Sequence, residues 1–354
     1  MNIGVVFGQM LVLLAMMAVG FWCYKKNWIT DESSGQLSKL VVNVFNPVLV
    51  VNGVLGQSRS NAGAGIGWNI VFIIGYFVIL VVLGFFMPML LHVDAGKKSI
   101  YRLMTVFSNV GFMGIPVIRS IFGNSAMIYV AFYILAYNIM LYTYGMYLAK
   151  KSGEEYKNRP VSYLEAVAAN GESRNESHKK SADNTKKLQP ATETSLEQSG
   201  LRGFLHQMIN PGVVAALIAV VIFATGITPP EAVGTFCDYM GNTTIPLSML
   251  LIGVSMAQAK LGEVFKDWRI YAFVLLRMVV LPIGMIFLLK GVVYTYAIEP
   301  VVFGVFIIEL GMPVGSIIAL MTREKGGDIA YCTKGVVLST LASIITIPLL
   351  CAFL

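Results

Sequence analysis

The feature that most restricts the fold is a series of apolar runs, each close to the roughly 20 residues that a helix needs to cross a bilayer. With 56% hydrophobic and 13% charged residues, the chain is far more apolar than a soluble globular protein. The pattern predicts an all-α polytopic membrane protein with ten transmembrane helices. We expect them at 3–24, 37–56, 68–91, 99–119, 125–149, 211–227, 231–257, 268–290, 300–321 and 328–354.

The fourth run contains residues that should break its helix near the middle of the membrane. Asn109 is followed by Gly111, Gly114 and Pro116. Glycine weakens a helix, and proline has no N–H to bond the carbonyl of the preceding turn. Lipid cannot satisfy the freed backbone groups, so such a break is tolerated only inside protein or beside a water-filled cavity.

The ninth run is interrupted at a similar depth by Glu309, Gly311 and Pro313. Two breaks at the midplane are typical of secondary transporters. We expect the half-helix after each break to start with its proline and to point free N–H groups into a cavity, which favours an anion. The carbonyl groups that end the preceding halves could hold Na⁺ or a protonated group, so the coupling ion is left open between H⁺ and Na⁺.

Arg277 lies near the centre of the eighth run, at a depth where its charge needs a partner. Two hypotheses follow. In the first, Arg277 forms an ion pair with Glu309 that locks two helices together. In the second, which we favour, Arg277 binds the carboxylate of a substrate.

Matched polar positions beside prolines occur in the second and seventh runs, where Asn46 precedes Pro47 and Asn242, Thr243 and Thr244 precede Pro246. These side chains are candidates for the other wall of a substrate site. A simple proline kink, repaired by neighbouring polar groups, is an equally good interpretation.

The chain divides into two halves of five helices, 1–150 and 204–354, joined by a polar segment at 151–203 that we expect to be a disordered linker. With five helices per half, the second half enters the membrane from the opposite side, so a repeat would be inverted. Landmarks recur at similar spacing, as in the pairs Pro47 and Pro246, Trp68 and Trp268, and Pro116 and Pro313.

Most Lys and Arg residues fall in the loops after the odd-numbered spans, whereas few, such as Arg59 and Lys290, lie near the other face. By the positive-inside rule, both termini are outside and the central loop is cytoplasmic. The net charge of +7 is therefore topogenic, and we expect lipid rather than nucleic acid as a partner. Neither a metal site, nor another cofactor, nor an enzymatic constellation is indicated.

Three segments resemble the auxin efflux carrier family: 109–116 (NVGFMGIP), 311–313 (GMP) and 338–348 (LSTLASIITIP). The family includes plant auxin exporters and bacterial permeases for malate and malonate, and this chain is more similar to the bacterial branch. The resemblance implies a scaffold of helices 1, 2, 6 and 7, often dimeric, and a transport domain of helices 3–5 and 8–10. It also implies that the broken fourth and ninth helices cross, with Asn109, Pro116 and Pro313 facing the substrate.

Together these observations predict a secondary transporter of small organic acids such as malate, malonate or auxin-like acids, working by alternating access. A cation/proton antiporter or sodium-coupled symporter of related architecture is one alternative, although the fifth run lacks the buried carboxylate expected of such an antiporter. A membrane receptor that transports nothing is another.

Overall fold

The computed structural model describes residues 3–55, 63–158, 211–258 and 267–354. Over these residues the secondary structure is helical, apart from one isolated pair of bridged residues. The first half contains α1 (Ile3–Lys25), α2 (Asp31–Leu40), α3 (Asn46–Val54), α4 (Gly63–Leu90), α5 (Lys98–Val106), α6 (Ile115–Phe122), α7 (Met127–Met140) and α8 (Met146–Lys157). The second half contains α11 (Pro211–Thr225), α12 (Glu231–Gln258), α14 (Trp268–Leu275), α15 (Leu281–Thr295), α16 (Pro300–Gly311), α17 (Ser316–Glu324) and α18 (Ile329–Phe353).

Helices occupy each of the ten places that the apolar runs predict. Within the described ranges, six continuous helical stretches are long and apolar enough to cross a membrane, and shorter apolar helices account for the other places. An all-α polytopic membrane protein is thereby confirmed. The inverted repeat and the division at 1–150 and 204–354 stay predictions.

Some boundaries differ from the predicted ones for clear local reasons. The second span begins at Asp31 rather than 37, because the Thr30 side chain and the Ser33 side chain cap each other's backbone N–H groups. The fifth span continues to Lys157, so the first residues of the predicted linker are helical. The rest of that linker, up to residue 203, lies outside the described residues.

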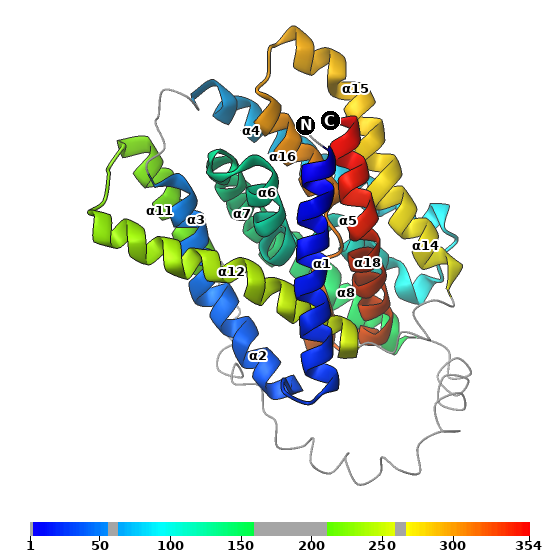
Figure 1. The fold of residues 1–354 in the computed structure, drawn as a ribbon. Helices are drawn as coiled ribbons and strands as arrows, with labels where there is room; N and C mark the ends of the chain where they lie inside the picture. Colours follow the sequence, from blue (N-terminus) through cyan, green and yellow to red (C-terminus); the bar gives the residue numbers. More distant parts are fainter. Residues whose placement is uncertain (1–2, 56–62, 159–210, 259–266) are drawn as a thin grey trace.

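The helices pack in two groups that are far from contiguous in the sequence. In one group α1 crosses and packs against α12, and α3 packs against both α11 and α12 (Figure 1). In the other, α4 packs on α5 and α16, and α18 packs on α14, α16 and α17. The groups meet where α1 contacts α18 and where α11 contacts α7. The functional division into scaffold and transport domain stays a prediction.

Three prolines each follow a widened helical turn at the same spacing. The π-helical turns Val41–Phe45, Val110–Gly114 and Leu276–Val280 are each followed, two residues later, by Pro47, Pro116 and Pro282. A proline ring collides with the carbonyl four residues earlier, and a wider turn relieves that collision. In these three spans the prolines therefore widen the helix instead of ending it.

Two glycines allow α1 and α12 to approach at backbone distance. A Cβ on Gly253 would overlap the carbonyl of Met17, and a Cβ on Gly20 would overlap the carbonyl of Leu250. Small residues at such a crossing let membrane helices gain van der Waals contact, which is a main source of their association in lipid.

We therefore expect Gly253→Ala to lower the thermal unfolding temperature of the detergent-purified protein, because its methyl group must push α1 away. The control is Gly284→Ala on α15, where the space around the added methyl is open. At such a site the change normally stabilises a helix by about 0.5–1 kcal/mol. An equal or higher unfolding temperature for Gly253→Ala would contradict the close crossing.

Candidate functional site

The two broken helices cross and pair through their backbones. Residues 107–109, after α5, and residues 312–315, after α16, are non-helical, and Ser108 lies opposite Val314 in an antiparallel bridge. Asn109 N–H donates to the Pro313 carbonyl at 2.8 Å, and Gly315 N–H donates to the Phe107 carbonyl at 3.0 Å. Each break thus supplies hydrogen-bond partners that lipid could not.

The break in the fourth span lies earlier than predicted. Helix α5 ends at Val106, and a new helical stretch begins at Val110, so the non-helical residues are 107–109 rather than the glycines and Pro116. Asn109 caps the new stretch, because its side-chain oxygen accepts from Phe112 N–H at 3.3 Å. Pro116 lies inside this stretch, after the widened turn, whereas Pro313 lies in the non-helical segment itself. The two prolines therefore do not mark equivalent positions, and neither starts a half-helix.

Ser339 of α18 supplies a hydrogen-bond partner for a backbone N–H group at the second break. Its hydroxyl accepts from Val314 N–H at 3.0 Å and donates to the Val336 carbonyl. Without this contact, a buried N–H would be left unpaired, at a cost of about 1–3 kcal/mol. The contact ties the crossing to the C-terminal helix.

Arg277 joins the ends of both upstream half-helices. Its Nε donates to the Thr105 carbonyl in the last turn of α5 at 2.8 Å, and one terminal nitrogen donates to the Leu310 carbonyl in the last turn of α16. The other terminal nitrogen donates to the Ser108 hydroxyl at 2.6 Å. These carbonyls lack their usual partners, because the N–H groups of Asn109 and Val314 bond elsewhere.

This geometry contradicts the first of the two hypotheses for Arg277, the ion pair with Glu309. No nitrogen–oxygen contact within ion-pair distance joins Arg277 to Glu309 among the described residues, so the predicted ion pair is wrong. The side chain is 1% exposed, and each of its three nitrogens donates a hydrogen bond to a protein oxygen. Binding of a substrate carboxylate by Arg277 stays a prediction. A guanidinium at the C-terminal ends of two helices instead compensates their negative dipole ends.

Glu309 is the unusual acid of the crossing. Its side chain is fully buried, and neither carboxyl oxygen has a hydrogen-bond partner among the described residues. It packs against Gly114, where a Cβ would lie 3.0 Å from one carboxyl oxygen. Glycine at 114 therefore makes room for the carboxyl group.

The remaining predicted residues lie in different places. The Asn46 amide faces the Gly111 carbonyl across a long 3.5 Å contact, so these two positions do come together. Gly311 instead accommodates Leu350 of α18 and has a packing role. Asn242 is exposed, and the Thr243 hydroxyl bonds back to Tyr239 of its own helix. Substrate binding by any of these residues stays a prediction.

Sequence reasoning missed several polar side chains that face the crossing or the interior. Tyr76 donates to the Ser108 hydroxyl at 3.0 Å, so Ser108 serves two donors. On α12, Ser248 is buried one turn after the predicted Thr244, which is buried as well, and neither hydroxyl has a partner among the described residues. Their spacing of one helical turn was the available signal, because it places both on the face that turns away from Asn242.

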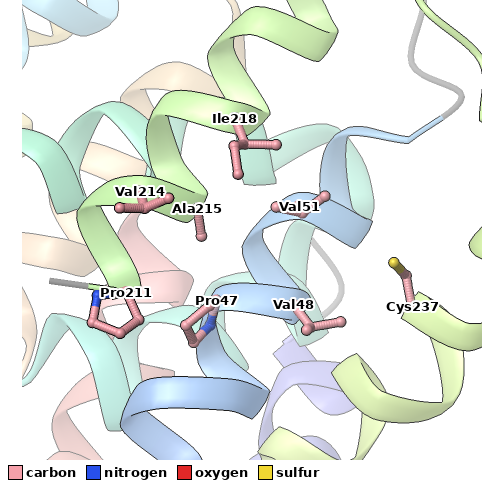
Figure 2. A pocket seen from close by; sticks show the side chains of 8 residues that line it. All are labelled: Pro47, Val48, Val51, Pro211, Val214, Ala215, Ile218 and Cys237. Carbon is pink, nitrogen blue, oxygen red and sulfur yellow. The ribbon is translucent and has the colours of Figure 1, made fainter.

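A separate cavity of about 530 Å³ lies between α3, α11 and α12. Figure 2 shows side chains of α3 and α11 facing each other across it, with Cys237 of α12 at one side. None of its lining residues is charged, so it cannot supply the counter-charge that would select an acid.

Among the described residues, no cluster of His, Cys, Asp and Glu is arranged to hold a metal. The crossing is therefore the better candidate site.

We expect Arg277→Gln to destabilise the protein much more than Glu309→Gln. The first change leaves buried acceptors unpaired, at about 1–3 kcal/mol each, whereas Glu309 has no hydrogen bond to lose. Thermal unfolding of the purified variants measures the difference, with Arg269→Gln at the surface as the control for loss of one positive charge. Similar losses for both buried variants, as breaking an ion pair from either side would produce, would contradict this account.

Comparison with known proteins agrees with this architecture. An uncharacterized transporter of Methanothermobacter thermautotrophicus is 21% identical over 346 residues, covering 96% of this chain and 95% of the relative. A family model described as membrane transport protein matches residues 5–351, nearly the whole chain. With its crossed, broken helices and the segments that resemble auxin efflux carriers, the chain belongs to this membrane transport protein family.

Proposed function

We propose that this protein is a secondary transporter that moves small organic acid anions across the membrane by alternating access, without changing them chemically. The observation that carries the proposal is the electrostatic asymmetry of the crossing. The carbonyl ends of α5 and α16 are buried and compensated by Arg277, so their negative dipole ends are neutralised.

The opposite ends of the crossing are accessible. Residues 103–110 and 302–315 are buried, whereas Gly111 and Phe112 after the first break and Ser316 and Ile317 after the second are partly exposed. These are the first turns of the downstream half-helices, where N–H groups without intrahelical partners carry partial positive charge. An anion is therefore the favoured occupant of the accessible side.

The surroundings support a small acid in particular. Asn109 and Asn46 are neutral hydrogen-bonding side chains beside the first of these turns. The nearby arginine bonds protein atoms, so the attraction would come from backbone groups and from the field of Arg277 at a distance. Malate, malonate and auxin-like acids all fit this chemistry. The proposal includes coupling to either H⁺ or Na⁺, and a homodimer that forms through helices 1, 2, 6 and 7.

Counterflow in proteoliposomes tests the proposal. Vesicles loaded with one unlabelled carboxylate should accumulate the labelled form of the same acid, in a panel of mono- and dicarboxylates with organic cations as the contrasting class. Accumulation of cations but of no carboxylate would identify a cation exchanger, and saturable binding without counterflow would identify a receptor. Either result would contradict the proposal.

The variant Asn109→Asp should reduce carboxylate counterflow at least tenfold while the protein still folds. Aspartate is as good an N-cap as asparagine, so the start of the half-helix is kept, but its negative charge repels an anion. Asn158→Asp, at the end of α8, makes the same change in charge away from the crossing and should transport normally. Normal counterflow by Asn109→Asp would remove the first break from the site.

The proposed orientation has both termini outside and the central loop in the cytoplasm. Single cysteines at Ser177 and Asn61, introduced after replacement of the four native cysteines, should then label from opposite sides. An impermeant reagent added to intact cells should label position 61 at once and position 177 only after the membrane is opened. Labelling of position 177 in intact cells would reverse the orientation.

A further inference from the structure

The three acceptors around Arg277 form an oxygen-lined position between the broken helices. Two are backbone carbonyls that end α5 and α16, and the third is the Ser108 hydroxyl at the bridge between the breaks. Carbonyl and hydroxyl oxygens are the ligands that hard cations prefer. Half-helix C-terminal ends and unwound carbonyls are also where broken-helix transporters coordinate coupling cations.

We propose that Arg277 is a built-in cation that fills this position, so that the crossing takes no mobile metal cation such as Na⁺. The hydrogen bonds put the guanidinium where a metal ion would have to sit to satisfy the same oxygens. Only the consequence for ion coupling rests on the proposed transport function. The hydrogen bonds of Arg277 do not depend on which acid is carried.

The chain holds this charge in a way that prevents its release. Arg277 projects from the widened turn Leu276–Val280, which Pro282 follows, so its backbone belongs to a span other than the two that cross. Guanidinium stays charged at all physiological pH values, and its planar fork can reach two carbonyls at once. The counter-charge is thus permanent and tethered, unlike an ion that binds and leaves in each cycle.

Removal of the guanidinium would leave an unpaired, oxygen-rich hole. The two carbonyls would lose the donors that Arg277 supplies. The Ser108 hydroxyl would lose one of its two donors and keep Tyr76. Glu309, the neighbour of Leu310 in the chain, also keeps a buried carboxyl group that has no partner among the described residues. A small monovalent cation is then the natural replacement for the lost charge.

Thermal unfolding in matched chloride salts of Na⁺, Li⁺, K⁺ and choline tests the proposal without any substrate. The wild-type protein should unfold at the same temperature in all four salts. Arg277→Gln should unfold lower in choline chloride, by about 5 °C or more, and Na⁺ or Li⁺ should restore part of the loss in a saturable manner. Arg269→Gln, which loses a partly exposed charge paired with Asp94, should show no response specific to one cation.

Three outcomes would overturn the proposal. They are stabilisation of the wild-type protein by Na⁺ over choline, full stability of Arg277→Gln in choline, and a destabilisation of Arg277→Gln that no cation relieves. If Arg277→Gln does not fold, Arg277→Lys replaces it. The lysine variant should fold with a lower unfolding temperature than wild type, and Na⁺ should not raise that temperature. A rise in Na⁺ would count against the proposal. Absence of carboxylate counterflow together with the expected unfolding pattern would refute the proposed function alone.

Discussion

When two helices are interrupted inside a membrane, every backbone group that the interruption frees needs a hydrogen-bond partner. Here the guanidinium of Arg277 is the main such partner. Thr105 and Leu310 would normally accept from Asn109 and Val314, but those N–H groups bond across the crossing and to Ser339. Arg277 replaces both lost donors at once. Because hydrocarbon offers no alternative partner, the cost of removing this side chain falls on two helices together.

The same contact gives the crossing a direction. Four helix ends meet there, two carrying partial negative charge and two carrying partial positive charge. A fixed cation on the negative pair leaves the positive pair uncompensated, and those are the ends with partly exposed residues. Under the proposed function, selectivity for an anion arises without any charged side chain touching the substrate, because the side chains beside the first exposed turn are the neutral, buried Asn46 and Asn109.

The glycines and prolines of the broken spans have separate tasks. Gly114 makes room for the Glu309 carboxyl, and Gly311 makes room for Leu350, so neither serves mainly to weaken a helix. Pro116 widens a turn, as Pro47 and Pro282 do, while Pro313 occupies a non-helical segment and offers its carbonyl to Asn109. A helix-breaking composition thus predicts that a span is irregular, but it does not say at which residue the helix ends.

By itself, the sequence determined the membrane class, the places of the ten helical segments and the presence of irregular backbone in the fourth and ninth, because apolar length and backbone propensity are local properties. Only the tertiary structure decided where the breaks lie and what Arg277 binds, since its acceptor Thr105 is 172 residues away in the chain. It also decided that Thr244 is buried and Asn242 exposed, a choice set by which face of α12 packs inward. Partners of buried polar groups are selected by packing between distant segments, and a single sequence carries no local signal for that selection.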